Sequence, residues 1–438
     1  MKKFYRIAFG SSLFLALALV VAGPGPALAA PPNSAQETQA GQPDRKYALA
    51  DLVALALQHT QLLSAQDARV EEKRLSAEQA RAWPGLSTGF LAGRTRQTAD
   101  SGSSYGLTLA QSIPLTGIPG LRGALLGLES ESLRVRRTAS EIFVTLFVAQ
   151  GAYEYAANRS KASFSEKRRM RFEVIQSYLA GRVFPTPQRR AESRIVENRL
   201  KNVAADAILS QAGFRASLEK LKAYVPLGPG RNPDIEVPWL SGAQSLSETE
   251  WLREALENNP DLRVQRLAVQ GAGLEKTLAS REGLPDTAIV GSYERGKADL
   301  IGASYGLGLS LTFPSWNRNR HGVASAEARR LAEERQLVYE TQKIKAGLSR
   351  ALAEYEAARR IVLQYPPEMM SELEAQLQDA DEGFRKGQVD LLTFLELDAS
   401  AAETFNLAQD AQVELASKAA ELLSVTADRD ALAKFGSF

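Results

Sequence analysis

The chain has 438 residues, of which 44% are hydrophobic and 24% are charged, values typical of a folded protein rather than a disordered one. Its formal net charge of +2 gives no indication of a nucleic-acid binder. Because the sequence has no cysteine, it excludes disulfides, thiolate metal sites, a cysteine nucleophile and a lipid-modified N-terminal cysteine.

The N-terminus has the features of a secretory signal peptide. A positive segment with Lys2 and Lys3 precedes an apolar stretch that ends near Val21, and a small-x-small cleavage site follows at residues 27–29. The alternative is a membrane anchor, but the stretch is short beside the roughly 20 apolar residues of a spanning helix. We predict a signal peptide over residues 1–29. With no later run of this kind, a mature chain that enters a membrane is expected to do so as a closed β-barrel.

The remainder of the chain reads as a duplication. Ser104–Leu109 closely resembles Ser304–Leu309 at an offset of 200 residues (305 − 105). A proline follows each run at the same distance, Pro114 in the first and Pro314 in the second. Weaker matches keep the same order on either side, and a segment rich in proline and glycine separates the halves. We predict a first repeat over residues 30–225, a linker over 226–247 and a second repeat over 248–438.

Each repeat contains two strand candidates in which large and small side chains alternate with a period of two. We place them at about residues 86–93 and 105–113, and at about 288–294 and 305–313. Glycine, serine and threonine occupy one face of the last strand. The opposite face is large and apolar, and we predict that it contacts lipid through Tyr305, Leu307, Leu309, Leu311 and Phe313.

Short helical segments precede the strands, over residues 49–82 and 248–281, and long helical hairpins follow them. We place the hairpins over about 119–225, with a tip near 181–186, and over about 317–430, with a tip near 387–390. Pro366-Pro367 should interrupt the second hairpin. The spacing of apolar and small residues alternates between four and three, which indicates a coiled-coil seam; one run is Ile344, Leu348, Ala351, Tyr355, Ala358 and Val362.

Four strands cannot close a membrane barrel, because the smallest such barrels use eight. An open sheet in lipid would leave backbone groups unpaired at high cost. The strands must therefore be shared among copies of the chain, and three copies would supply twelve strands and a tube of long helices. The predicted fold class is mixed α and β, mainly α, with four strands per chain in a trimeric 12-stranded transmembrane barrel.

The sequence gives no support for catalysis. His59 and His321 are the only histidines, and a lone histidine is more often structural than catalytic. Residues 291–298 nearly spell a phosphate-binding loop, but they lack the Ser or Thr that holds magnesium and no helix follows them. We expect neither an enzyme nor a cofactor or metal site.

The chain resembles the TolC-like outer membrane factor family, and within that family it is closest to the heavy-metal branch typified by CzcC and CusC. The resemblance rests on the duplicated strand–helix plan and on two motifs, Leu309–Arg320 before the second long helix and Phe384–Leu392 at a helix–helix turn. It implies a homotrimer in the outer membrane of a Gram-negative bacterium, with a periplasmic α-helical barrel below. It also implies two partners, a periplasmic adaptor and an inner-membrane pump.

The resemblance implies a passive efflux channel whose cargo includes heavy-metal cations. Two alternatives remain open. The first is the outer-membrane duct of a type I protein secretion system, which shares the fold. The second is a soluble periplasmic coiled-coil scaffold, which would not need four alternating strands and would not need detergent for extraction.

Two hairpin turns are the candidate docking sites for the adaptor. They occupy equivalent places in the two repeats, and glycine in each permits the positive φ that a tight turn often needs. By resemblance they form the periplasmic tip that meets the adaptor; the alternative is a pair of plain turns. The residues are Gly181, Arg182, Val183, Gly387, Gln388 and Val389.

The hairpins also carry opposite charge. Residues 165–194 hold eight basic and three acidic residues, and residues 371–400 hold eight acidic and two basic residues. These are either solvated helix faces or complementary surfaces that hold the periplasmic end closed. By resemblance, acidic residues past the second tip line a pore constriction. The pore and gate candidates are Thr393 and Glu396, the alternates Asp390 and Asp398, and the basic residues Arg182, Arg189 and Arg190.

Overall fold

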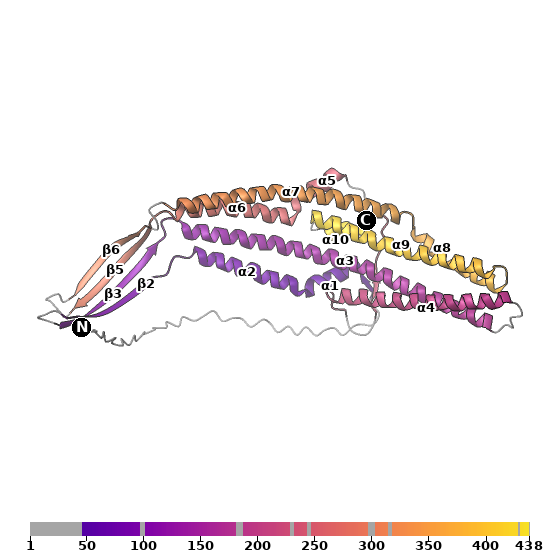
Figure 1. Ribbon diagram of the computed structural model, residues 1–438. Helices are drawn as coiled ribbons and strands as arrows, with labels where there is room; N and C mark the ends of the chain where they lie inside the picture. Colours follow the sequence, from indigo (N-terminus) through magenta and orange to yellow (C-terminus); the bar gives the residue numbers. More distant parts are fainter. Residues whose placement is uncertain are drawn as a thin grey trace, which may run out of the picture. The chain divides into compact units, whose positions relative to one another are not determined.

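The computed structural model describes residues 46–96, 101–180, 187–227, 232–242, 247–296, 303–313, 318–427 and 430–437. All of them lie in the unit Asp44–Phe438. This unit is mainly helical, which confirms the predicted class, and its four long strands lie at one end, away from the tips of the helical hairpins (Figure 1). The predicted signal peptide lies outside the described residues.

The first repeat passes from two short helices through a pair of strands into a long helical hairpin. Its elements are β1 (Lys46–Ala48), α1 (Leu49–His59), α2 (Gln61–Arg81), β2 (Ser87–Arg96), β3 (Ser101–Ile113), α3 (Ile118–Ala180) and α4 (Pro187–Lys222).

The second repeat follows the same plan, with one extra break in its first long helix. Its elements are β4 (Asp234–Glu236), α5 (Glu248–Asn258), α6 (Pro260–Arg281), β5 (Asp286–Gly296), β6 (Ser304–Thr312), α7 (Arg320–Val362), α8 (Pro367–Arg385), α9 (Leu391–Thr426) and α10 (Ala431–Ser437).

Proline and its preceding residue explain the breaks in the second repeat. Asn259 caps α6 by accepting hydrogen bonds from the N–H groups of Asp261 and Leu262, and Pro260 is the first residue of that helix. Sequence analysis predicted one helical segment over residues 248–281 and another over residues 49–82. The second segment also divides into two helices, at Thr60. As predicted, Pro366-Pro367 interrupts the second hairpin: α7 ends at Val362, and α8 begins at Pro367.

The strands form one antiparallel sheet in the order β2-β3-β5-β6. The helices beside them keep the corresponding order, since α3 contacts α2 on one side and α6 on the other, and α6 contacts α7. A second, parallel pair joins β1 to β4, which sequence analysis did not predict. Arg159 of α3 holds this pair through Asp234, at 2.6 Å.

Most of the core lies where helices of both repeats meet. Leu52 and Ala56 of α1, Val148 of α3 and Leu415 of α9 are among its fully buried members. The C-terminal α10 closes it with Phe435, which is also fully buried. Because many of these positions are alanine, the helices approach one another closely.

The predicted coiled-coil seam of α7 is confirmed, because all six of its members are buried. Below the main core, a separate cluster packs α3 and α4 against α8 and α9 near the hairpin tips; its buried members are Phe172, Ile175, Leu179, Val196, Val203, Ala380 and Phe394. Among the described residues, no helix combines the length and the apolar character needed to cross a membrane.

Candidate functional site

The sheet has two unlike faces. Residues directly opposite one another in the register point to the same side, so Phe90, Leu107, Tyr293 and Tyr305 form one row across all four strands. The next row on that face holds Thr88, Leu109, Gly291 and Leu307. This face therefore carries the large apolar side chains.

Small and polar residues cover the opposite face. One of its rows holds Gly89, Thr108, Ser292 and Gly306, and the next holds Leu91, Gly106, Glu294 and Ser304. Leu91 and Glu294 are the large residues of these two rows, and Val290 lies on the same face opposite Gly308.

The apolar face is open to its surroundings. Tyr305 is 80% exposed and Leu307 is 86% exposed, which is far from the usual state of large apolar side chains in a soluble protein. Leu309, Leu311 and Phe313 are exposed as well. All five residues that the sequence proposed for lipid contact therefore lie on the surface of the protomer.

The second hairpin tip is a well-defined turn. Gly387 has a φ of +73°, as glycine permits, and its N–H bonds the carbonyl of Phe384. The N–H of Gln388 bonds the carbonyl of Gly383 at 2.8 Å, which completes a Schellman motif at the end of α8. Asp390 then caps α9 by accepting hydrogen bonds from the N–H and Oγ1 of Thr393, and these bonds lower the pKa of Asp390.

One ion pair between the hairpins is buried. The guanidinium of Arg168 in α3 donates to both carboxylate oxygens of Asp398 in α9, with Nη2 at 2.5 Å from Oδ2. Asp398 is fully buried and Arg168 is 7% exposed. Arg199 of α4 lies 4.0 Å from the same carboxylate, so three helices meet at this charge.

Comparison with known proteins finds a family similar to part of the chain. Residues 251–427, most of the second repeat, match the family described as outer membrane efflux protein. Over these residues the chain is similar to the outer membrane efflux proteins, in agreement with the resemblance read from the sequence. No curated protein matches it in sequence.

Solved structures extend the likeness of fold over most of the chain. A structure of CusC is 14% identical, with a TM-score of 0.67, and the match covers 86% of this chain and 91% of that one. The open-state MtrE outer membrane channel of Neisseria gonorrhoeae is 17% identical, with a TM-score of 0.68 and coverage of 86% and 88%. A membrane protein of Pseudomonas aeruginosa is 18% identical, with a TM-score of 0.68 and coverage of 86% and 90%.

The candidate gate residues fall into different environments. Thr393 and Glu396 are exposed on α9. Asp398, proposed as an alternate pore residue, instead faces α3 from a fully buried position, and the other alternate, Asp390, serves as the helix cap. Arg190 is exposed. Gly181, Arg182 and Val183 lie outside the described residues, as does the side chain of Arg189.

Charge complementarity between the hairpins is present among the described residues; of the three arginines proposed for it, Arg182 and the side chain of Arg189 lie outside them. Besides Arg168 with Asp398, Lys167 of α3 binds Glu374 of α8 at 2.5 Å. The sequence counted these side chains among the charged groups without pairing them. Helix phase could have indicated Arg168, because it precedes Phe172 by four residues on the face of α3 that packs against α9.

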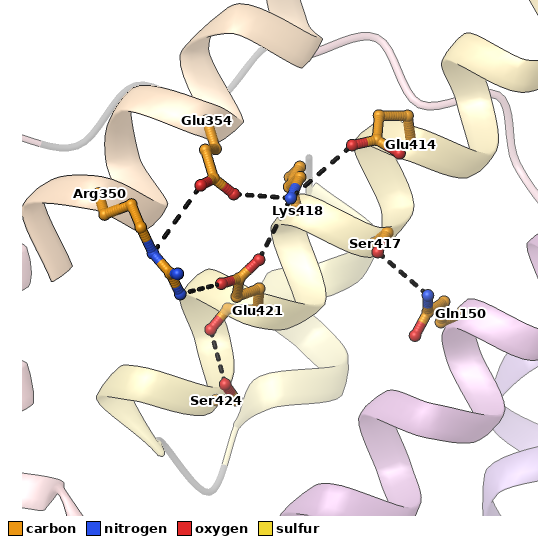
Figure 2. Close-up of polar contacts among 8 residues, drawn as sticks. All are labelled: Gln150, Arg350, Glu354, Glu414, Ser417, Lys418, Glu421 and Ser424. Carbon is orange, nitrogen blue, oxygen red and sulfur yellow. Dashed lines mark hydrogen bonds and ion pairs between the residues drawn. The ribbon is translucent and has the colours of Figure 1, made fainter. Parts of the chain in front are cut away.

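Nearer the main core, a polar belt joins α3, α7 and α9 (Figure 2). Its residues are Gln150, Arg350, Glu354, Glu414, Ser417, Lys418, Glu421 and Ser424. Figure 2 shows Lys418 of α9 between Glu354 of α7 and two glutamates of its own helix, with the Glu354 Oε2 at 2.6 Å. The hydrogen bond from Lys418 lowers the pKa of Glu354, and Glu354 raises the pKa of Lys418. Gln150 of α3 donates to Ser417 on the other side. The belt fixes α9 between α3 and α7; sequence analysis missed it.

Proposed function

We propose that three copies of this chain form an outer-membrane channel that passively conducts a substrate from an inner-membrane pump and a periplasmic adaptor to the exterior. The observation that carries the proposal is the sheet. One face is apolar and exposed, the other is mostly small and polar, and the outer edges of β2 and β6 pair with no strand among the described residues.

Edge strands present unpaired backbone N–H and C=O groups, which cost several kcal/mol each in lipid. A four-stranded protomer is too small to remove its own edges by closing. Three protomers joined edge to edge would give twelve strands, with the face of Leu307 and Leu309 toward lipid and the face of Gly306 and Ser292 toward the lumen. The fold shared with CusC and MtrE supports this arrangement.

The helices supply the periplasmic part of the proposed channel. α3 alone has 63 residues, which at 1.5 Å per residue reach on the order of 90 Å. We assign adaptor docking to the hairpin tips, with Gly181, Arg182 and Val183 in the first and Gly387, Gln388 and Val389 in the second. The Schellman turn favours this role, because it presents the exposed Gln388 on a fixed backbone.

For cargo we propose heavy-metal cations, with Glu396 as the carboxylate that they pass. Its side chain is exposed on α9, and three copies around an axis would form a ring of like charge that attracts multivalent cations. Planar-bilayer conductance tests this: Glu396→Gln should weaken cation selectivity and block by multivalent cations. Unchanged selectivity and block would remove Glu396 from the pore.

The assembly itself is tested by purification. The protein should require detergent for extraction, form a trimer by light scattering, and insert into planar bilayers as discrete conductance steps. A stable detergent-free monomer that retains its sheet would refute the channel and favour a soluble scaffold.

A further inference from the structure

The internal duplication makes the seam between the two repeats a template for the seam between two copies. Within one protomer, β3 of the first repeat pairs with β5 of the second. The free edges are β2 and β6, which are the repeat equivalents of β5 and β3. If copies join edge to edge, as the proposed trimer requires, β6 of one copy meets β2 of the next in the same relation.

The registers of β2 with β3 and of β5 with β6 show which residues of the two repeats are equivalent. Leu107 pairs with Phe90 in the first repeat, and Leu307 pairs with Gly291 in the second. Since Leu307 is the equivalent of Leu107, Gly291 is the equivalent of Phe90. Within the protomer Leu109 pairs with Gly291 across the repeat seam. The equivalent of that pair between two copies is Leu309 with Phe90.

We propose that β6 of one protomer pairs antiparallel with β2 of a second copy in the register that places Leu309 opposite Phe90 of the partner subunit. The inference rests on the proposed channel and adds the geometry by which its sheet closes. In this register Gly308 lies opposite Leu91 of the partner subunit, and Ser310 lies opposite Gly89 of the partner subunit.

Strand length and side-chain direction lead to the same register without the duplication. β6 has nine residues and β2 has ten, so only two registers keep every residue of β6 opposite a residue of β2. The two differ by one position, and a slip of one position turns every side chain to the other face. Only the register with Leu309 opposite Phe90 of the partner subunit continues the apolar face across the seam.

Burial and packing favour this seam. Phe90 and Leu91 of β2 are 72% and 73% exposed, and Leu309 of β6 is 67% exposed. In the proposed register Leu91 of the partner subunit faces Gly308, where an added Cβ would meet nothing within 4 Å, so the large side chain has room. Leu91 of the partner subunit thus lies against a glycine, as Val290 does within the protomer.

The helices support the same pairing of copies, although they do not define a register. The outer helices of the layer, α2 and α7, are the equivalents of α6 and α3, which contact each other inside the protomer. Both outer helices expose large apolar residues: Leu62 and Leu75 on α2, and Leu331, Val338 and Tyr339 on α7. A second copy joined at the sheet would cover them.

Cysteine pairs test the register, because the natural chain has none. The predicted pairs are Gly308→Cys with Leu91→Cys and Ser310→Cys with Gly89→Cys. The matched controls exchange partners, Gly308→Cys with Gly89→Cys and Ser310→Cys with Leu91→Cys. Every substitution thus occurs once in a predicted pair and once in a control. Opposite residues lie about 4.5–5.5 Å apart and diagonal ones about 7–8 Å, beyond the usual reach of a disulfide.

Oxidation should convert both predicted pairs into reducible covalent dimers and trimers on denaturing gels, at ten times or more the yield of either control. A light-scattering trimer that cross-links through a control pair and through neither predicted pair would overturn the register and leave the channel proposal intact. A monomer in detergent with no intermolecular cross-link in any pair would overturn the channel and the register together.

Discussion

Removal of the buried carboxylate of Asp398 should loosen the contact between α3 and α9 more than any other single charge deletion between these helices. Asp398→Ala leaves the guanidinium of Arg168 buried, with Asp206 at 3.7 Å as its remaining ion-pair partner among the described residues. Breaking a buried pair by deleting one partner costs about 3–5 kcal/mol. At about 1.4 kcal/mol per factor of ten, local opening should become about 100 to 4,000 times more frequent.

Hydrogen–deuterium exchange of the detergent-solubilised protein measures this opening directly. Backbone amides near Arg168 and Asp398 should exchange faster by that factor. The matched control is Asp410→Ala, which breaks another ion pair between α3 and α9, with Lys161, at an aspartate that is 64% exposed. Such a pair contributes about 0–1 kcal/mol, so exchange there should change by less than about tenfold.

A second variant separates pairing from packing. Arg168→Met combined with Asp398→Leu removes both charges and keeps the volume, which is often neutral or stabilising for a buried pair. Its exchange rates should return to within about tenfold of the unmodified protein. Equal exchange in Asp398→Ala and Asp410→Ala would refute the reasoning, because it would show that burial does not set the strength of these contacts.

Three further predictions follow from the sheet, the tip and the belt. Leu309→Arg should reduce the folded trimer in outer membranes, at a cost of about 2–4 kcal/mol near the bilayer midplane, whereas Ser310→Arg on the opposite face should be tolerated; the reverse order would exchange the two faces. Gly387→Ala should cost about 1–2 kcal/mol, because φ is +73° there and nothing lies within 4 Å of the added Cβ; an unchanged melting temperature would contradict it. Because the pKa of Glu354 is lowered, its bond to Lys418 stabilises the fold above the ordinary value of 4.5, and this stability is lost as pH falls through the folded pKa. Lys418→Met should therefore make the free energy of unfolding less dependent on pH in that range. An unaltered pH dependence would exclude the bond.

The strands could be predicted from sequence because their signal is local. Alternation with a period of two and the matched runs at 104–109 and 304–309 placed β3 and β6 to within a few residues. The first strands carry a weaker pattern, and the structure extends β2 to Arg96 and β5 from Asp286 to Gly296. The parallel pair of β1 and β4 has only three residues per strand, too few for any periodicity to appear.

The site was harder to predict because it depends on which helix faces meet. Sequence composition indicated opposite charge on the two hairpins, and that complementarity exists. The partner of Arg168 is 230 residues away, and nothing in the local pattern distinguishes the buried Asp398 from the exposed Glu396 two positions earlier. In a helix two positions rotate a side chain by about 200°, so an error of this size moves a carboxylate from surface to core.

The two repeats keep equal spacing where a slip would be costly and differ where it would not. Across β3 and β6 the equivalence is residue for residue, since a one-residue insertion in a strand would turn every following side chain to the wrong face. The helical hairpins have no such constraint, and α3 runs unbroken for 63 residues where the second repeat divides at Pro366-Pro367 into helices of 43 and 19 residues. The proposed closure of the sheet on a second copy would explain the difference, because the register of β6 against β2 of the partner subunit would then depend on the spacing that the strands have kept.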